Sequence, residues 1–195
     1  MRNNLLSWVL LMGATIATPL SAQVVPSAES GGGFHLNIAG TYSPARFSQV
    51  KGASFWVQGG SLQMQARLGS RLGLVTDARS FYTSNINSTG VGLTLITATA
   101  GPRYTLPISR NLSVFGQVLF GRAMAFNGLF PNGTHLETSA NSFALLTGGG
   151  LEMRLTDRIS LRAIEANRMR THLPNGATND QNALLLGGGI VYWFK

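Results

Sequence analysis

Apolar and polar residues alternate with a period of two along most of the chain. In residues 61–68, for example, the even positions are apolar and the odd positions are polar. A helix does not keep this period, whereas a half-buried strand does. The same pattern predicts eight strands at about residues 34–42, 61–68, 72–82, 91–104, 112–124, 142–155, 159–164 and 184–194.

The connections between these strands alternate in length. Short turns are expected at residues 69–71, 106–111 and 156–158, and longer polar stretches at residues 43–53, 83–90, 127–140 and 171–181. Two of the long stretches carry the turn sequence Pro-Asn-Gly, starting at Pro131 and Pro174. Three short and four long connections predict an all-β, closed, eight-stranded antiparallel up-and-down barrel. With an even strand number both termini lie at the end of the short turns.

Composition points to a barrel that sits in lipid. Charged residues make up only 11% of the chain, whereas soluble domains carry roughly 25%. A transmembrane barrel needs little surface charge because its outer face contacts hydrocarbon. The formal charge of +8 comes mostly from arginines that are scattered from Arg46 to Arg170, so no basic patch suggests nucleic acid as a partner. The chain has no cysteine, which excludes disulfides.

The N-terminus has the features of a secretory signal peptide. Arg2 precedes an apolar run at residues 5–16, followed by Pro19 and the small residues Ser21 and Ala22. This run is too short to cross a bilayer of about 30 Å as a helix. We expect a signal peptide at residues 1–22, a short periplasmic linker at residues 23–32, and the barrel domain at residues 33–195.

Three strands fit the alternation poorly. Leu93 and Leu95 are out of phase with the rest of the fourth strand. In the fifth, Gln117 and Arg122 have opposite parities, which requires a bulge or an early exit from the membrane. The seventh loses its phase beyond residue 164, so we expect that part of the strand to stand outside the bilayer.

Charged residues on the polar face of the strands are predicted to fill the lumen. They are Arg67, Asp77, Arg79, Arg103, Glu152, Arg154 and Arg162. Buried charges must be paired, and an eight-stranded barrel has little room for a channel, so we expect a cluster of ion pairs. The alternative is a narrow, low-conductance pore lined by arginine.

The sequence contains no recognisable catalytic, cofactor or metal site. His35, His135 and His172 do not have the spacing of a zinc site or a catalytic triad. A lipid A-modifying enzyme would need a Ser-His pair at the outer rim. His172 has Thr171 beside it and Ser139, Ser142 and Thr178 within plausible reach, but no His-Ser motif like that of a lipid A deacylase is present. A soluble ligand-binding barrel would need an apolar lumen and a polar exterior. We therefore expect a protein that is not an enzyme and binds no cofactor.

The end of the chain resembles the C-terminal signal read by the outer-membrane barrel-assembly machinery. Its alternate residues are Leu186, Gly188, Ile190, Tyr192 and Phe194. Lys195 departs from this signal, which usually ends on the aromatic residue.

Four stretches resemble segments of porin-family barrels of the outer membrane protein A superfamily. They are GLVTDARSFY, AGPRYTL, GGGLEMRLTDRISLRAIEA and RTHLPNGATNDQNALLLGGGIVYWF, and the resemblance covers about residues 33–194. It implies an integral outer-membrane barrel with both termini in the periplasm and a structural or surface-interaction role. The implied partners are outer-membrane lipid and, during biogenesis, the assembly machinery, and the implied state is a monomer.

Overall fold

The computed structural model describes residues 35–48, 54–86, 91–132, 135–175 and 179–194. The signal peptide and the linker expected at residues 1–32 lie outside this part of the chain. Among the described residues, no helix is long and apolar enough to span a membrane. The strands are β1 (Leu36–Tyr42), β2 (Ala45–Ser48), β3 (Ser54–Arg67), β4 (Leu72–Thr83), β5 (Leu93–Pro107), β6 (Leu112–Asn132), β7 (His135–Arg154), β8 (Ile159–Thr171) and β9 (Gln181–Trp193).

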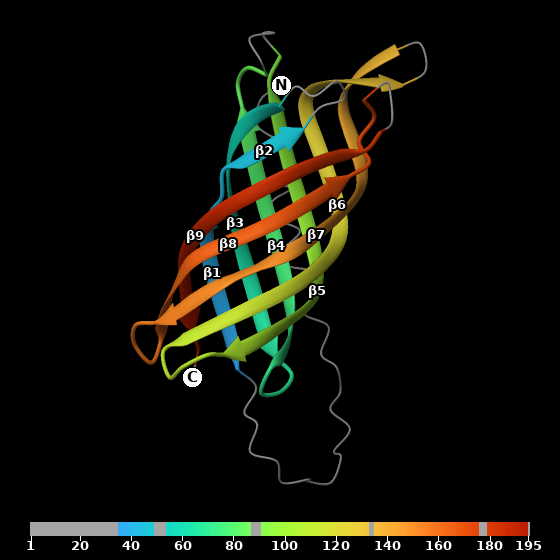
Figure 1. Cartoon of the computed structure of the whole chain (residues 1–195). Coiled ribbons are helices and arrows are strands. Elements are labelled where there is room, and N and C mark those ends of the chain that lie inside the picture. The colour runs from blue at the N-terminus through green and yellow to red at the C-terminus, as the bar shows by residue number, and fades with distance from the viewer. Residues whose placement is uncertain (1–34, 49–53, 87–90, 133–134, 176–178, 195) are drawn as a thin grey trace, which may run out of the picture. The chain divides into compact units, whose positions relative to one another are not determined.

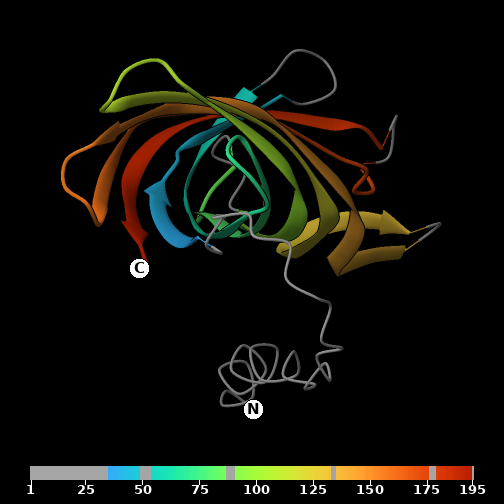
Figure 2. The same ribbon diagram turned by 90° about the horizontal axis from the view of Figure 1, so that it is seen from below.

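The strands close into one antiparallel ring (Figure 1). From β3 to β9 each strand pairs with its neighbour in the chain. β1 and β2 share one place in the ring, because both pair with β3 on one side and with β9 on the other. Figure 2 shows the same strands from below, so that the ring is seen end-on. The nine described strands therefore form the closed eight-stranded barrel that the alternation predicts, and this prediction is confirmed.

The first barrel strand is longer than its pattern suggests. Ser43 and Pro44 interrupt it, and proline has no backbone N–H to donate to the ladder. The inward phase nevertheless continues across the break, since Thr41, Ser43 and Phe47 are all buried. The loop predicted at residues 43–53 is therefore wrong in its first half, where the strand runs on to Ser48.

Two further boundaries differ from the prediction. β3 begins at Ser54 rather than at residue 61. The loop predicted at residues 127–140 is wrong, because β6 and β7 continue there as a paired hairpin up to Asn132 and His135. The ladder shifts between Phe126 and Phe130, where Asn127 has a φ of 58°, a left-handed conformation that asparagine tolerates well. This bulge breaks the alternation, which is why the pattern suggested a loop.

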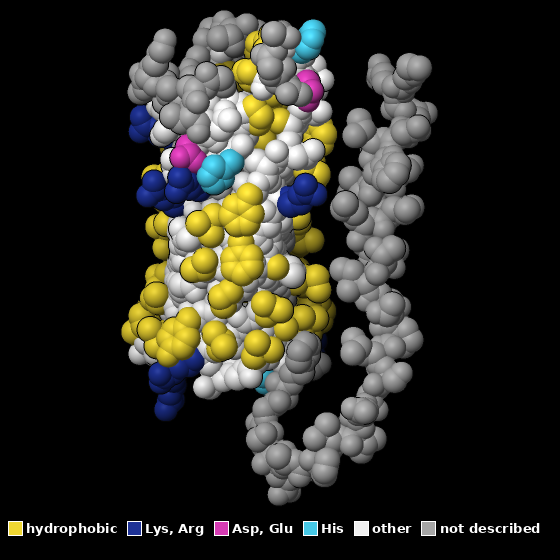
Figure 3. Space-filling view, turned by 90° about the vertical axis from the view of Figure 1, so that its right-hand side faces the viewer, with side chains coloured by type: hydrophobic (Ala, Val, Ile, Leu, Met, Phe, Trp, Pro, Cys, Tyr) yellow, Lys and Arg dark blue, Asp and Glu magenta, His cyan; other side chains and the backbone are white. Residues whose placement is uncertain are grey.

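The two faces of the barrel wall have opposite chemistry. In β4, Val75, Asp77 and Arg79 are buried in the lumen, whereas Leu72 and Leu74 face outward and are each 48% exposed. On the face shown in Figure 3, the outward hydrophobic side chains form a band between two levels of arginine. In a protein that lay in water this band would be an unusually large apolar surface.

The two ends of the barrel differ in their connections. Three turns, at residues 68–71, 108–111 and 155–158, lie at the end where β1 begins and β9 ends, which we call the short-turn end (Figure 1). The opposite, long-loop end carries the β6–β7 hairpin and the connections at residues 84–92 and 172–180.

The irregularity in the fifth predicted strand has a simple explanation. The pairing of β6 with β7 is continuous from Leu112 to Phe126, so no bulge separates Gln117 from Arg122. Gln117 is buried in the lumen and Arg122 is exposed on the outside. The structure therefore has no bulge at this point of the strand, and Arg122 faces outward near the long-loop end.

A β-bulge in β8 reverses the inward parity of that strand. The pairing of β8 with β7 and its pairing with β9 both shift register at Ala163 and Ile164. The side chains of these two residues are exposed. Before the bulge Arg162 faces the lumen, and after it Glu165 and Asn167 do, with 1% and 2% of their surfaces exposed. The expectation that this part of the strand lies outside the membrane because its phase is lost is therefore wrong. One extra residue has restored an inward face with the opposite parity.

The bulge predicts an asymmetric response to single-residue deletions in β8. Deleting Ala163 leaves one outward residue between Arg162 and Glu165, so every later side chain keeps its face. Deleting Ala166 removes one residue from a regular segment and turns Arg168 into the lumen. We expect the Ala163 deletion to keep the heat-dependent gel shift of a folded barrel and the Ala166 deletion to lose it. Equal loss of the shift in both variants would contradict the bulge assignment.

Candidate functional site

A network of buried charges crosses the lumen. Arg79 Nη2 lies 2.9 Å from Asp77 Oδ2 and 2.9 Å from Glu165 Oε1. Arg162 continues the network, with Nη1 2.6 Å from the second oxygen of Glu165. The side chains of Asp77, Arg79, Arg162 and Glu165 are inaccessible to solvent. Strands β4 and β8, which lie far apart in the sequence, thus meet through their side chains inside the barrel.

The network ends on Arg103 of β5. Glu152 Oε1 lies 2.7 Å from Arg162 Nη2 and 4.0 Å from Arg103 Nη1. Three arginines and three carboxylates therefore alternate across the lumen, and their formal charges cancel. We call these six residues, Asp77, Arg79, Arg103, Glu152, Arg162 and Glu165, the lumen network.

Amide side chains complete the hydrogen bonding of the lumen network. Gln63 Nε2 donates to Asp77 Oδ2 at 2.7 Å, and Gln63 Oε1 accepts from Arg162 Nη1 at 2.6 Å. Gln117 Oε1 accepts from Arg103 Nε at 3.0 Å, and Gln117 Nε2 donates to Asn167 at 3.1 Å. Such bonds offset part of the cost of moving the charges out of water. Gln63 and Gln117 share the inward parity with the charged residues, although they were not among the predicted lumen residues.

An aromatic ring supports two of the arginines. The guanidinium carbons of Arg103 and Arg162 lie 4.3 Å and 4.9 Å from the centre of the Phe115 ring. These are cation–π distances, and such contacts are strong when water is excluded. Gly150 leaves space for the ring, since a Cβ there would lie 2.9 Å from its tip.

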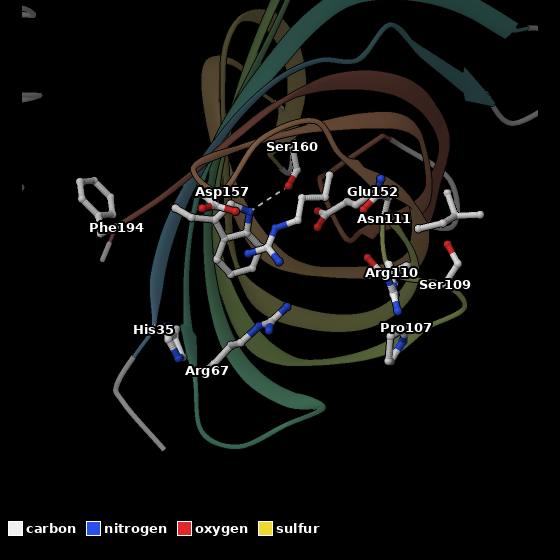
Figure 4. Close-up of a pocket in the computed structure, with 14 residues that line it drawn as sticks. His35, Arg67, Pro107, Ser109, Arg110, Asn111, Glu152, Asp157, Ser160 and Phe194 are labelled. Carbon is white, nitrogen blue, oxygen red and sulfur yellow. Dashed lines mark hydrogen bonds between the residues drawn. The ribbon is translucent and has the colours of Figure 1, made fainter. Parts of the chain in front are cut away.

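The structure separates two of the seven predicted lumen residues from the others. Arg67 and Arg154 have the inward parity but lie at the last positions of β3 and β7. There they line an open pocket of about 340 Å³ at the short-turn end, together with Arg110, Glu152 and Asp157 (Figure 4). Arg67, Arg110 and Arg154 form no ion pair within the described part of the chain. We call these three residues the mouth arginines.

Trp193 holds one mouth arginine in place. The guanidinium carbon of Arg67 lies 4.6 Å from the centre of the Trp193 ring. Trp193 Nε1 in turn donates a hydrogen bond of 3.0 Å to Ser160 Oγ (Figure 4). The last residue of β9 is thus anchored to both β3 and β8.

The histidines do not converge on one another. His35 lines the pocket at the short-turn end, and His135 is the first residue of β7. His172 Nε2 lies 3.0 Å from Asp180 Oδ1, while its backbone N–H donates to Ser142 Oγ at 3.3 Å. Among the described residues, no group of three or more His, Cys, Asp or Glu side chains could hold a metal ion.

An ion pair at the long-loop end connects β8 to the start of β9. Arg170 Nη2 lies 2.8 Å from Asp180 Oδ2. The hydrogen bond from Arg170 lowers the pKa of Asp180 below its usual value, and the charges of Arg170 and His172 act in the same direction. The ring of His172 is therefore engaged with a carboxylate at this rim.

Most of the chain matches the model of a known protein family. The model of the family described as outer membrane protein beta-barrel domain matches residues 9–192. A search of curated proteins finds no significant match.

Solved structures with the same fold have low sequence identity to the chain. The chain is similar to Neisserial surface protein A, with 17% identity and a TM-score of 0.60 over 85% of this chain and 100% of that chain. It is also similar to Ail, the attachment invasion locus protein of Yersinia pestis, with 17% identity and a TM-score of 0.52 over 83% and 99%. Ail in complex with the heparin analogue sucrose octasulfate gives 19% identity and a TM-score of 0.54 over the same shares.

Proposed function

The chain belongs to the outer membrane protein β-barrel domain family, and from this premise we propose that it is a non-enzymatic structural barrel with a closed lumen. The family implies the outer membrane. The observation that carries the proposal is the lumen network, whose six charges are paired and whose amide neighbours are hydrogen-bonded. A water-filled channel would instead leave such side chains solvated.

We further propose an orientation for the barrel. The short-turn end, with both termini of the barrel, faces the periplasm, as expected for bacterial barrels with an even strand number. The long-loop end then faces the outside, where the loops are available for surface contacts. The outward row that ends in Tyr192 and Phe194 serves as the signal for the assembly machinery. The protein functions as a monomer, since a closed ring leaves no strand edge to pair.

The contacts of His172 support a role without catalysis. A Ser-His enzyme needs the serine hydroxyl within hydrogen-bonding reach of the imidazole. Here Ser142 Oγ accepts a hydrogen bond from the backbone N–H of His172 and donates one to the carbonyl oxygen of Phe143, so its hydrogen bonds among the described residues do not involve the imidazole.

Electrical recording tests the closed lumen. In a planar bilayer we expect the inserted protein to give no conductance steps, because the lumen network leaves no hydrated path. Insertion is checked in parallel by the heat-dependent gel shift of the same preparation. Steady steps from the unmodified protein would favour the alternative, a narrow arginine-lined pore.

Removal of the protein from its host separates the same two functions. If the barrel is structural, its loss is expected to raise the entry of a large apolar dye through a weakened outer membrane. If it is a pore, its loss is expected to lower the uptake of small polar solutes and to leave dye entry unchanged.

A further inference from the structure

The lumen has a second, apolar half that the sequence did not predict. Beyond the lumen network, towards the long-loop end, the inward side chains are Val57, Phe81, Leu95, Leu146, Met169 and Leu185, all almost fully buried. They belong to one continuous hydrophobic cluster. Leu95, which appeared out of phase in the sequence, faces this apolar half.

A cavity of about 480 Å³ opens above this cluster at the long-loop end. Aromatic and aliphatic side chains line most of it, among them Phe47, Phe55, Leu95, Phe130 and Leu173. None of the described residues that line it carries a charge. Its volume lies within the range of about 300 to 1,000 Å³ typical of small-molecule sites, which are also mostly apolar.

The cavity is closed towards the middle of the barrel. The rings of Phe47 and Phe55 stack with their centres 5.5 Å apart, and the Phe81 ring packs edge-on against Phe47 at 6.1 Å. Below them the hydrophobic cluster and then the lumen network fill the lumen. A molecule in the cavity must therefore enter and leave at the long-loop end.

The two amide side chains at the cavity, Gln181 and Asn175, already have partners. Gln181 Nε2 donates to the carbonyl oxygen of Leu173 at 3.1 Å, and Gln181 Oε1 accepts from Thr171 Oγ1 at 3.0 Å. Asn175 exchanges hydrogen bonds with Asn179, from each backbone N–H to the other side-chain oxygen, at 3.1 Å and 2.9 Å. These amides do not need a ligand to satisfy them. Since no described residue that lines the cavity carries a charge, none of them offers a counter-ion to a charged ligand, which would lose its hydration there.

We propose that this cavity is a binding site for a small, uncharged, apolar molecule such as a medium-length alkyl chain with a neutral head. The removal of the ligand's apolar surface from water drives its binding. The site recognises apolarity and length rather than a specific polar group. This binding activity goes beyond the structural role, and it stands even if the lumen proves to conduct.

Methyl NMR on the full chain in phosphatidylcholine nanodiscs tests the site with 1-decanol as the probe. We expect saturable shifts of the methyl signals of Leu95 and Leu173, which face the cavity. Leu62 and Leu74, which face lipid, should change only linearly as decanol dissolves in the bilayer. Identical linear responses at all four residues would overturn the proposal.

Two matched substitutions on β5 locate the binding. Leu93→Trp fills the cavity and is expected to weaken decanol binding at least tenfold. Leu106→Trp makes the same change on the lipid-facing side and should leave the affinity unchanged. An unaltered titration in Leu93→Trp overturns the proposal. If Leu93→Trp lacks the gel shift of a folded barrel, Val91→Trp makes the same test from a cavity residue outside the strands.

The ligand class is tested with decanoate at neutral pH, where this probe is an anion. We expect it to bind at least tenfold more weakly than 1-decanol, because no described lining residue can pair with its carboxylate. Equal affinity for the two probes would overturn the assignment of an uncharged ligand.

Discussion

Replacing Glu165 by glutamine is expected to lower the free energy of unfolding of the barrel by about 3 to 5 kcal/mol, the usual effect of removing one partner from a buried ion pair. Glu165 contacts two arginines, Arg79 at 2.9 Å and Arg162 at 2.6 Å. Glutamine keeps the shape of the side chain but removes its charge. Both arginines then remain buried with one carboxylate fewer between them.

Urea unfolding in lipid vesicles, followed by tryptophan fluorescence, measures this loss. The control is Glu137→Gln, which makes the same chemical change at an exposed position on the β6–β7 hairpin. Even an exposed carboxylate that takes part in a surface ion pair contributes only about 0 to 1 kcal/mol. A Glu165→Gln barrel as stable as the control would show that the lumen is hydrated enough to solvate its charges.

Replacing Leu62 by arginine is expected to cost about 2 to 4 kcal/mol, because the new charge would face hydrocarbon near the middle of the membrane. Leu62 faces outward and is 56% exposed. It pairs with Ala78, at the middle of β4, and with Gly40. In a protein surrounded by water the same change would be almost neutral.

The matched control for Leu62→Arg is Leu68→Arg at the short-turn end. Leu68 is 65% exposed and follows the last residue of β3. There the charge reaches the interface, where the cost is about 0 to 1 kcal/mol. Unfolding in vesicles compares the two variants. Equal stabilities would contradict the placement of the apolar band in the hydrocarbon.

Strand parity could be predicted from the sequence because it is a local property. In a regular strand the face of each side chain depends only on whether its number is odd or even. Asp77, Arg79 and Arg103 lie in regular segments, and each occupies the predicted inward position. The pattern also separates Arg122 from Gln117 correctly by parity, although it could not decide how the strand accommodates them.

The errors arise where the backbone departs from the regular ladder. Glu165 joins the lumen network only because the bulge at Ala163 adds one residue, which a regular alternation does not include. A signal was present, since Glu165, Asn167 and Thr171 share one parity of their own. At Pro44 the first strand is interrupted, so its continuation to Ser48 was predicted as a loop.

The apolar half of the lumen was missed for a different reason. Near the long-loop end both faces of some strands are apolar, as in β5, where Leu93 and Leu95 share the inward parity with the threonines that follow. Alternation then no longer distinguishes the inside from the outside. Which apolar side chains meet across the lumen depends on the closure of the ring, and that is a property of the tertiary structure.

The cancellation of charge within the lumen network has an electrical consequence. Moving a net charge through a membrane potential requires about 2.3 kcal/mol per charge for each 100 mV. Three arginines balanced by three carboxylates carry no net charge into the hydrocarbon layer, so a transmembrane voltage does no net work on this part of the barrel during insertion. The mouth arginines, by contrast, leave a local excess of positive charge at the short-turn end. The work that an applied field does on the described barrel therefore comes from charges outside the lumen network, such as the mouth arginines at one end and Arg122 and Arg168 towards the other.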